Sequence, residues 1–145
     1  NAICKHQGVA ELDPLEFNDF LKTKMEMVES DDSFMNRPVN VGFSGGEKKR
    51  SEILQLAVLE PKLAMLDELD SGLDVDALGK IAETIAMIRK PETSIIIVTH
   101  YARILKNLKA DHVHVMRDGK IIASGDERLA HKLEETGYGW IDSSI

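Results

Sequence analysis

The sequence predicts an α/β domain with its polar, chemically active side chains at the carboxyl edge of a parallel sheet. From residue 61 onward, short apolar runs of strand length alternate with segments of helical period. Two of these runs end in polar pairs, Asp67-Glu68 and Thr99-His100. The part before residue 61 has helical periodicity but no strand pattern, which indicates a helical subdomain packed beside the sheet.

Two helices are expected before residue 61, and both carry the same start signal. Asp13 can cap the first helix, with Glu16 three residues later to complete a capping box. Ser44 and Glu47 repeat this arrangement at the start of the second helix, and Pro61 ends it. A polar, turn-rich stretch over residues 30–40 separates the two helices.

The middle of the chain predicts a strand, a helix and a second strand. The apolar run Leu63 to Leu66 is typical of a parallel strand buried on both faces. Asp74 caps the helix that follows, whose buried stripe is expected to comprise Leu78, Ile81, Ala82, Ile85 and Ile88. The β-branched segment Ser94 to Val98 predicts the second strand.

The last third predicts a short helix, a hairpin and a final helix. The short helix would place Ile104, Leu105 and Leu108 inward. Strands at 113–116 and 120–123 flank Asp118-Gly119, a strong signal for a two-residue hairpin turn. The final helix is expected to end at Gly137, a natural C-cap.

Composition excludes several classes of function. The 145 residues, 43% of them hydrophobic, suffice for one domain or a large piece of one. The net charge of -7 argues against nucleic-acid binding, which needs a basic surface. No apolar run approaches the roughly 20 residues that cross a bilayer, so no direct membrane insertion is expected. The single Cys4 cannot form an internal disulfide, which fits a reducing compartment.

The first candidate site is the glycine-rich turn before the second helix. Ser44 at the N-cap, followed by Gly45 and Gly46, leaves backbone N–H groups bare at the positive end of a helix. This is an arrangement that binds anions, and Lys48 adds charge. Taken alone, the run is better explained as a capped helix behind a glycine-rich turn with a solvated basic face, because Ser-Gly-Gly is common.

The second candidate site lies where the two predicted strands end. Asp67 and Glu68 at a sheet edge can hold Mg²⁺ and orient or deprotonate an attacking water. His100 lies beside them if the two strands are neighbours. The alternative is that these acidic residues simply end a strand and have no chemical role. That explanation suits a single carboxylate better than two adjacent ones. The pairs Cys4 and His6, and His112 and His114, lack further ligands, so surface positions are favoured over metal sites.

Four motifs in order resemble the C-terminal half of an ABC-type ATPase: Ser-Gly-Gly-Glu, a strand ending Asp-Glu, Ser-Gly-Leu-Asp, and a strand ending Thr-His. Longer runs narrow the resemblance to the SufC family, the ATPases of the SUF iron–sulfur cluster assembly machinery. These runs are spread along the chain from residue 39 to residue 140: Val39–Arg50, Leu56–Pro61, Asp70–Asp74, Val98–Tyr101, Arg103–Leu105, Val113–Val115 and Gly137–Trp140.

The resemblance implies a role for each motif. The signature motif, which would contact ATP bound to the opposite subunit, comprises Ser44, Gly45, Gly46 and Glu47. Glu47 stands where the commonest signature has Gln, a variation that the SufC family shares. Asp67 would be the Walker B carboxylate near Mg²⁺, with Glu68 as the general base. Asp74 would belong to the nucleotide-contacting D-loop, Ser71–Asp74, and His100 would sense the γ-phosphate.

The resemblance also implies what is missing from these 145 residues. They contain no G-x-x-x-x-G-K-[ST] phosphate loop, and they begin at Asn1 without an initiator Met. The expected fold is therefore an ABC-type nucleotide-binding domain lacking its N-terminal lobe, with half a catalytic site and no activity alone. Within 1–145, the helical subdomain with the signature motif would span about 10–60, and the C-terminal part of the α/β core 61–145.

By the same resemblance, the cofactors are ATP and Mg²⁺, and the partners are SufB- and SufD-like scaffold proteins. ATP binding would form a head-to-tail homodimer, in the cytoplasm or in a plastid stroma. Two alternatives stay open. One is the C-terminal lobe of an SMC-type DNA-organising ATPase, which predicts coiled-coil heptads; the other is the ATPase subunit of an ABC transporter.

Overall fold

The computed structural model describes residues 1–39, 41–101, 104–105 and 108–141. Its elements in chain order are α1 (Ala2–Gln7), α2 (Pro14–Met27), the 3-10 helix η1 (Asp32–Asn36), α3 (Gly45–Leu59), β1 (Leu63–Asp67), α4 (Val75–Ile88), β2 (Ser94–Val98), β3 (Val113–Arg117), β4 (Lys120–Gly125) and α5 (Glu127–Thr136). Every strand and the four longer helices match the elements expected from the sequence. The two shortest helices, α1 and η1, were not predicted.

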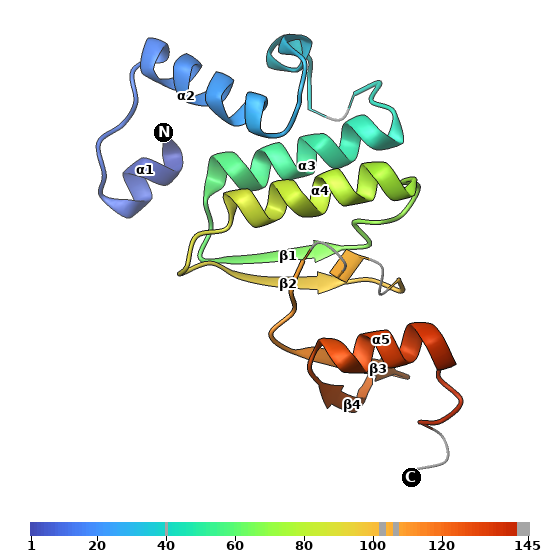
Figure 1. Cartoon of the computed structure of the whole chain (residues 1–145). Helices are drawn as coiled ribbons and strands as arrows, with labels where there is room; N and C mark the ends of the chain where they lie inside the picture. The colour runs from blue at the N-terminus through green and yellow to red at the C-terminus, as the bar shows by residue number, and fades with distance from the viewer. Residues whose placement is uncertain (40, 102–103, 106–107, 142–145) are drawn as a thin grey trace.

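The elements form layers, which Figure 1 shows in one view. Helices α3 and α4 lie side by side over the sheet of β1 and β2, and α2 packs on the far side of α3. The hairpin of β3 and β4 forms a second sheet, against which α5 packs. Both α3 and α4 run opposite to the strands, so their N-termini lie at the same end as the carboxyl ends of β1 and β2.

The pairing of β1 with β2 is parallel, as the alternation of elements predicts. The register aligns Leu63 with Ser94 and Asp67 with Val98, so the two strands end level with each other. The Glu68 N–H extends the ladder by donating to the Val98 carbonyl at 2.9 Å. The residues that follow each strand therefore emerge together at one edge.

The expectation that β1 is buried on both faces is wrong. Ala64 is buried and Leu66 packs against the core, but Met65 on the opposite face is 71% exposed. The same is true of β2, where Ile96 and Val98 face outward. Side chains alternate between the faces of a strand, and α3 and α4 cover only one face.

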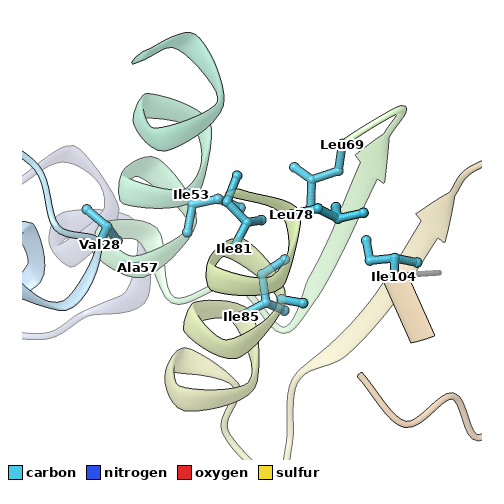
Figure 2. Packing of buried hydrophobic residues seen from close by; sticks show 9 residues of the cluster. Val28, Ile53, Ala57, Leu69, Leu78, Ile81, Ile85 and Ile104 are labelled. Carbon is cyan, nitrogen blue, oxygen red and sulfur yellow. The ribbon is translucent and has the colours of Figure 1, made fainter. Parts of the chain in front are cut away.

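The core lies between α3, α4 and the covered face of the sheet, as Figure 2 shows. Its buried members are Val28, Ile53, Ala57, Leu69, Leu78, Ile81, Ala82, Ile85 and Ile104. The predicted stripe of α4 is confirmed, except that Ile88 is only partly buried at the margin of this cluster. Burial of each large aliphatic side chain stabilises the fold by about 1.5–3 kcal/mol.

Helix ends and turns follow the sequence signals closely. Both predicted capping boxes form, at Asp13 and at Ser44. In the hairpin turn Asp118 and Gly119 have φ angles of 50° and 72°, the pair of positive values that a type I′ turn requires. The predicted helix after Thr99 falls partly on residues 102–103 and 106–107, outside the described residues, although Ile104 is buried as expected.

Glu60, just beyond α3, ties the helices together. Its φ of 42° turns the chain out of the helix. Its carboxylate accepts hydrogen bonds from Lys24 of α2 at 2.7 Å and from Lys90, which follows α4, at 2.5 Å. The Lys24 ammonium, and then Lys90, hold the pKa of Glu60 below its usual range. One carboxylate therefore joins three helices by charge.

Candidate nucleotide site

The Ser44 turn (residues 44–47) begins α3 with a reciprocal pair of hydrogen bonds. The Ser44 N–H donates to Glu47 Oε2 at 2.7 Å, and the Glu47 N–H donates to Ser44 Oγ at 3.3 Å. Apart from the backbone of the helix itself, a Cβ atom added at Gly45 or Gly46 would meet no atom of the described residues within 4 Å, so none of these residues crowds the two glycines. The turn therefore presents accessible backbone at the positive end of a helix, as the sequence predicts.

Arg37, which the sequence analysis did not single out, holds the other side of Glu47. Its Nη1 donates to Glu47 Oε1 at 2.8 Å, and its Nη2 donates to the Gly42 carbonyl at 3.1 Å. The Ser44 backbone N–H and, second, Arg37 lower the pKa of Glu47 to about 2. Glu47 is thus a carboxylate at neutral pH. No spacing rule relates a loop residue to a helix residue ten positions away, so this pair could not be predicted from the sequence.

The sheet edge (residues 67–70 and 98–101) is built from the ends of β1 and β2. Asp67 is the last residue of β1, and both Asp67 and Glu68 are exposed. Glu68 has a φ of 44°, in the left-handed region that costs a non-glycine residue about 1–2 kcal/mol. Strain of this kind gathers at functional sites, and here it turns the chain sharply off the strand at the predicted general base.

Asp70 joins the two strand ends by a side-chain hydrogen bond. Thr99 Oγ1 donates to Asp70 Oδ2 at 2.6 Å and accepts the Tyr101 N–H at 2.9 Å. Asp70 is 1% exposed, and its Oδ1 is buried with no hydrogen-bond partner among the described residues. The sequence analysis named Asp70 only as the first residue of the run Asp70–Asp74 and gave it no role, because its partner Thr99 lies 29 positions further along the chain. This bond fixes the segment after β1 to the one that carries His100.

The remaining predicted site residues occupy the same edge. His100 is exposed, with its ring centroid 4.0 Å from that of Tyr101. Asp74 caps α4 by accepting the Ala77 N–H at 2.8 Å, a structural use of a residue predicted to contact nucleotide. Asp67, Glu68 and His100 are therefore brought to one edge, and their roles there stay predictions.

The Ser44 turn and the sheet edge lie at the same end of the layered part, where α3 begins and β1 and β2 end (Figure 1). The hydrogen bonds given above for the turn join residues between Arg37 and Glu47, and those of the edge join residues between Glu68 and Tyr101. The two sites are thus held by separate networks.

The donor set at the sheet edge fits a magnesium ion. Mg²⁺ in nucleotide sites commonly takes one or two protein carboxylates and completes its shell with phosphates and water. Exposed Asp67 at a strand end offers such an oxygen ligand. The described part of the chain has no cluster of three or more His, Cys, Asp or Glu residues suited to a metal, and His114 Nδ1 lies 2.8 Å from Ser124 Oγ.

Among the described residues, no helix combines the length and apolar character needed to cross a membrane.

Comparison with known proteins gives close relatives. The chain is 50% identical over 141 residues to "Probable ATP-dependent transporter SufC" of Escherichia coli, covering 97% of this chain and 57% of that protein. It is 48% identical over 145 residues to a "Probable ATP-dependent transporter" of Synechocystis, of which it covers 57%. An Arabidopsis thaliana protein named "ABC transporter I family member 6, chloroplastic" is 50% identical over 138 residues, 95% of this chain and 41% of that protein. No family model matches the chain.

Solved structures share the fold. A dimeric bacterial ABC transporter cassette matches 82% of this chain and 50% of its own, with a TM-score of 0.68 and 19% identity. A Clostridium perfringens cassette, described as part of the ABC transporter complex cbiONQ, matches 92% of this chain and 52% of its own, with a TM-score of 0.66 and 26% identity.

The solved structures show which fold the chain has, and the relatives show which proteins its sequence is similar to. The chain spans about half the length of the relatives and cassettes that it matches. Both predictions from the sequence, the incomplete ABC-type cassette and the resemblance to SufC, are confirmed. The chain has the fold of part of an ABC-type nucleotide-binding cassette, and along nearly its whole length it is similar to SufC and to cyanobacterial and plastid relatives of SufC.

Proposed function

We propose that this chain is part of the ATP-hydrolysing subunit of an iron–sulfur cluster assembly complex, in which it drives conformational change in a SufB/SufD-type scaffold. The observation that carries the proposal is the parallel register, which brings Asp67-Glu68 and Thr99-His100 out level at one edge of the sheet. Its specificity for cluster assembly is supported by 50% identity to SufC of Escherichia coli.

The sheet edge supplies the catalytic groups. Asp67 would hold Mg²⁺, which neutralises charge developing on the phosphates when it is bound. Glu68, at its strained turn, orients the attacking water and accepts its proton. His100, exposed after the end of β2, would donate a hydrogen bond to the γ-phosphate of the substrate ATP. The Asp70–Thr99 bond keeps these two segments at a constant separation.

The Ser44 turn would complete the site of a second copy in a head-to-tail homodimer. The open space above Gly45 and Gly46 lets phosphate oxygens approach the backbone N–H groups at the helix terminus. Ser44 Oγ and Glu47 shape that terminus. Asp74, the last residue of the turn Ser71–Asp74, would lie at the dimer interface. Its carboxylate is kept in place because it caps α4 by accepting the Ala77 N–H.

The helical subdomain, about residues 10–60, would bind the scaffold, and 61–145 would form the C-terminal part of the α/β core. Between α2, η1 and α3 the surface is hollowed by about 230 Å³, with mainly apolar walls that include Leu21, Phe34, Phe43 and Leu54. We place the SufB- or SufD-like partner on residues 12–40, along one side of this hollow. The proposed location is the cytoplasm or a plastid stroma; the chloroplastic relative supports the second.

Glu68→Gln tests the proposed function. With a SufC N-terminal lobe supplied in trans, we expect this variant to lose turnover while it keeps ATP binding and accumulates as a nucleotide-bound dimer. Glu135→Gln, the same change at an exposed position of α5, is the matched control and should hydrolyse ATP normally. Hydrolysis by Glu68→Gln within a few-fold of the unmodified chain would contradict the assignment of the base.

The chain alone is proposed to be inactive, because its 145 residues carry no phosphate-loop sequence, and such a loop provides most of the contacts to phosphates. Isothermal titration of the purified chain with Mg-ATP should detect weak binding or none. Micromolar affinity without an added lobe would show that the nucleotide site has been misplaced.

A second candidate is the ATPase subunit of a membrane transporter, favoured by the word "transporter" in the names of the relatives. Co-purification separates the two candidates. A SufB- or SufD-like protein should be retained by the chain, whereas retention of a permease would favour transport. Charge reversal at Lys22, an exposed position of α2, should weaken retention of the scaffold, and Lys120→Glu on the hairpin is the control. Lys24 is left unchanged, because its ion pair with Glu60 fastens α2 to α3.

A further inference from the structure

The guanidinium of Arg37 occupies a position that links two parts of the helical subdomain. It makes two hydrogen bonds toward the Ser44 turn, to Glu47 Oε1 at 2.8 Å and to the Gly42 carbonyl at 3.1 Å. The guanidinium also lies over the ring of Phe43, with 4.4 Å between the guanidinium carbon and the ring centroid. Arg37 also lines the hollow between α2, η1 and α3.

We propose that Arg37 is the positioning residue of the Ser44 turn: it holds the Glu47 carboxylate, and through it the backbone of the turn. Both oxygens of Glu47 are used, Oε1 by Arg37 and Oε2 by the Ser44 N–H. Removal of Arg37 leaves one oxygen without this donor and frees the side chain to rotate. The hydrogen bond from the Ser44 N–H to Glu47 Oε2, the shorter bond of the capping box, then breaks more often.

The geometry of the cap explains why the turn depends on Glu47. The bond from the Glu47 N–H to Ser44 Oγ is 3.3 Å long, beyond the usual range for an N–H···O bond. The bond from the Ser44 N–H to Glu47 Oε2 is 2.7 Å and has an ionised acceptor. The stronger half of the capping box is therefore the half that Arg37 supports.

Arg37 is itself well placed to act as a fixed support. The rings of Phe34 and Phe43 pack on each other with centroids 4.9 Å apart, and both lie within reach of the guanidinium. A planar guanidinium held on aromatic rings loses little further freedom when it binds a carboxylate. Arg37 thus brings a preorganised donor to Glu47.

The position of Arg37 has a consequence for the partner, and this step alone rests on the proposed function. A scaffold bound along residues 12–40 would contact the hollow whose wall includes Arg37 and Phe43. Movement of these side chains would be transmitted to Glu47 and then to the turn that contacts nucleotide. Scaffold binding and ATP contact would therefore be coupled through one ion pair.

Hydrogen–deuterium exchange of the Ser44 amide tests the positioning role directly, because this N–H donates to the carboxylate that Arg37 holds. In Arg37→Met at neutral pH we expect Ser44 to exchange about tenfold faster, a measure of more frequent local opening. Core amides such as that of Ile81 should not change. Arg128→Met is the matched control, since Arg128 also pairs with a carboxylate at a helix N-terminus, that of Asp126.

Two further variants keep the inference testable if Arg37→Met does not fold. Arg37→Lys should exchange at an intermediate rate, because one ammonium cannot reproduce both bonds of the guanidinium. In a Glu47→Gln background, Arg37→Lys should have little additional effect, since the charged acceptor is gone. Unchanged Ser44 exchange in Arg37→Met, or equal effects with and without the Glu47 carboxylate, would overturn the positioning role.

Turnover separates this inference from the proposed function. With the N-terminal lobe added, Arg37→Met should raise the KM for ATP several-fold with a smaller change in kcat, and Arg37→Lys should partly restore it. Faster Ser44 exchange in a protein that never hydrolyses ATP would leave Arg37 as the support of the turn while the proposed function fails. Normal KM together with unchanged exchange would remove the inference and leave the ATPase assignment intact.

Discussion

The Ser44 turn and the sheet edge are built in opposite ways. The turn is local: its bonds join residues three to ten positions apart, and both oxygens of Glu47 are satisfied. The edge joins residues 29 positions apart through Asp70 and Thr99, and it leaves a buried carboxylate oxygen without a described partner. A local cap is set by short-range sequence, whereas the edge depends on the pairing of two distant strands.

The largest expected effect falls on the edge. His100→Ala removes the proposed γ-phosphate contact, and we expect turnover with the N-terminal lobe added to fall roughly 10²–10³-fold. Steady-state hydrolysis assays measure this effect, with His131→Ala on α5 as the control. Equal losses in both variants would mean that His100 has no special part in the chemistry.

Thr99→Val comes next and tests the long-range bond of the edge. It removes the hydroxyl that donates to Asp70, leaving a buried carboxylate with neither oxygen paired to a described donor. Loss of such a bond destabilises a fold by about 1–3 kcal/mol. Urea unfolding measures it, and Thr99→Ser, which keeps the hydroxyl, should stay close to the parent chain. Equal stability of the Val and Ser variants would argue that the edge is held by other contacts.

Ser44→Ala is the corresponding change in the turn and should cost less. The lost cap contributes about 1 kcal/mol in a typical helix, and here the bond to Ser44 Oγ is long and exposed. The difference in unfolding free energy between Thr99→Val and Ser44→Ala measures how unequal the two sites are. A larger loss for Ser44→Ala would reverse the comparison.

The smallest effect is the pH dependence of the turn. The folded-state pKa of Glu47 is lowered to about 2 from an ordinary 4.5. Its contribution to stability is therefore fully present above about pH 4.5 and is lost as the pH falls toward 2. Glu47→Gln should flatten this part of the pH–stability curve. If the unmodified chain and Glu47→Gln had the same pH–stability curve between pH 4.5 and 2, the pKa of Glu47 would not be lowered by folding.

The sequence predicted what neighbouring residues decide and missed what distant ones decide. Both capping boxes, the Asp118-Gly119 hairpin and the apolar stripe of α4 follow from short spacings, and the structure has them all. Arg37 and Asp70 carry no local signal, because their partners are set by how the loop and the strands pack. The exposed face of β1 was missed for a related reason: apolar residues indicate a strand, but they do not say how many of its faces are covered.

Glu60 makes the attachment of the helices sensitive to ionic strength. Its two ion pairs differ in shielding: the Lys24 side chain is 15% exposed, whereas that of Lys90 is 48% exposed. Dissolved ions screen exposed charges over a distance of about 10 Å at 0.1 M salt and reach shielded pairs less. Added salt should therefore loosen the tie between α3 and the end of α4 first. Helix α2 would stay fastened to α3 at salt concentrations that have already released Lys90.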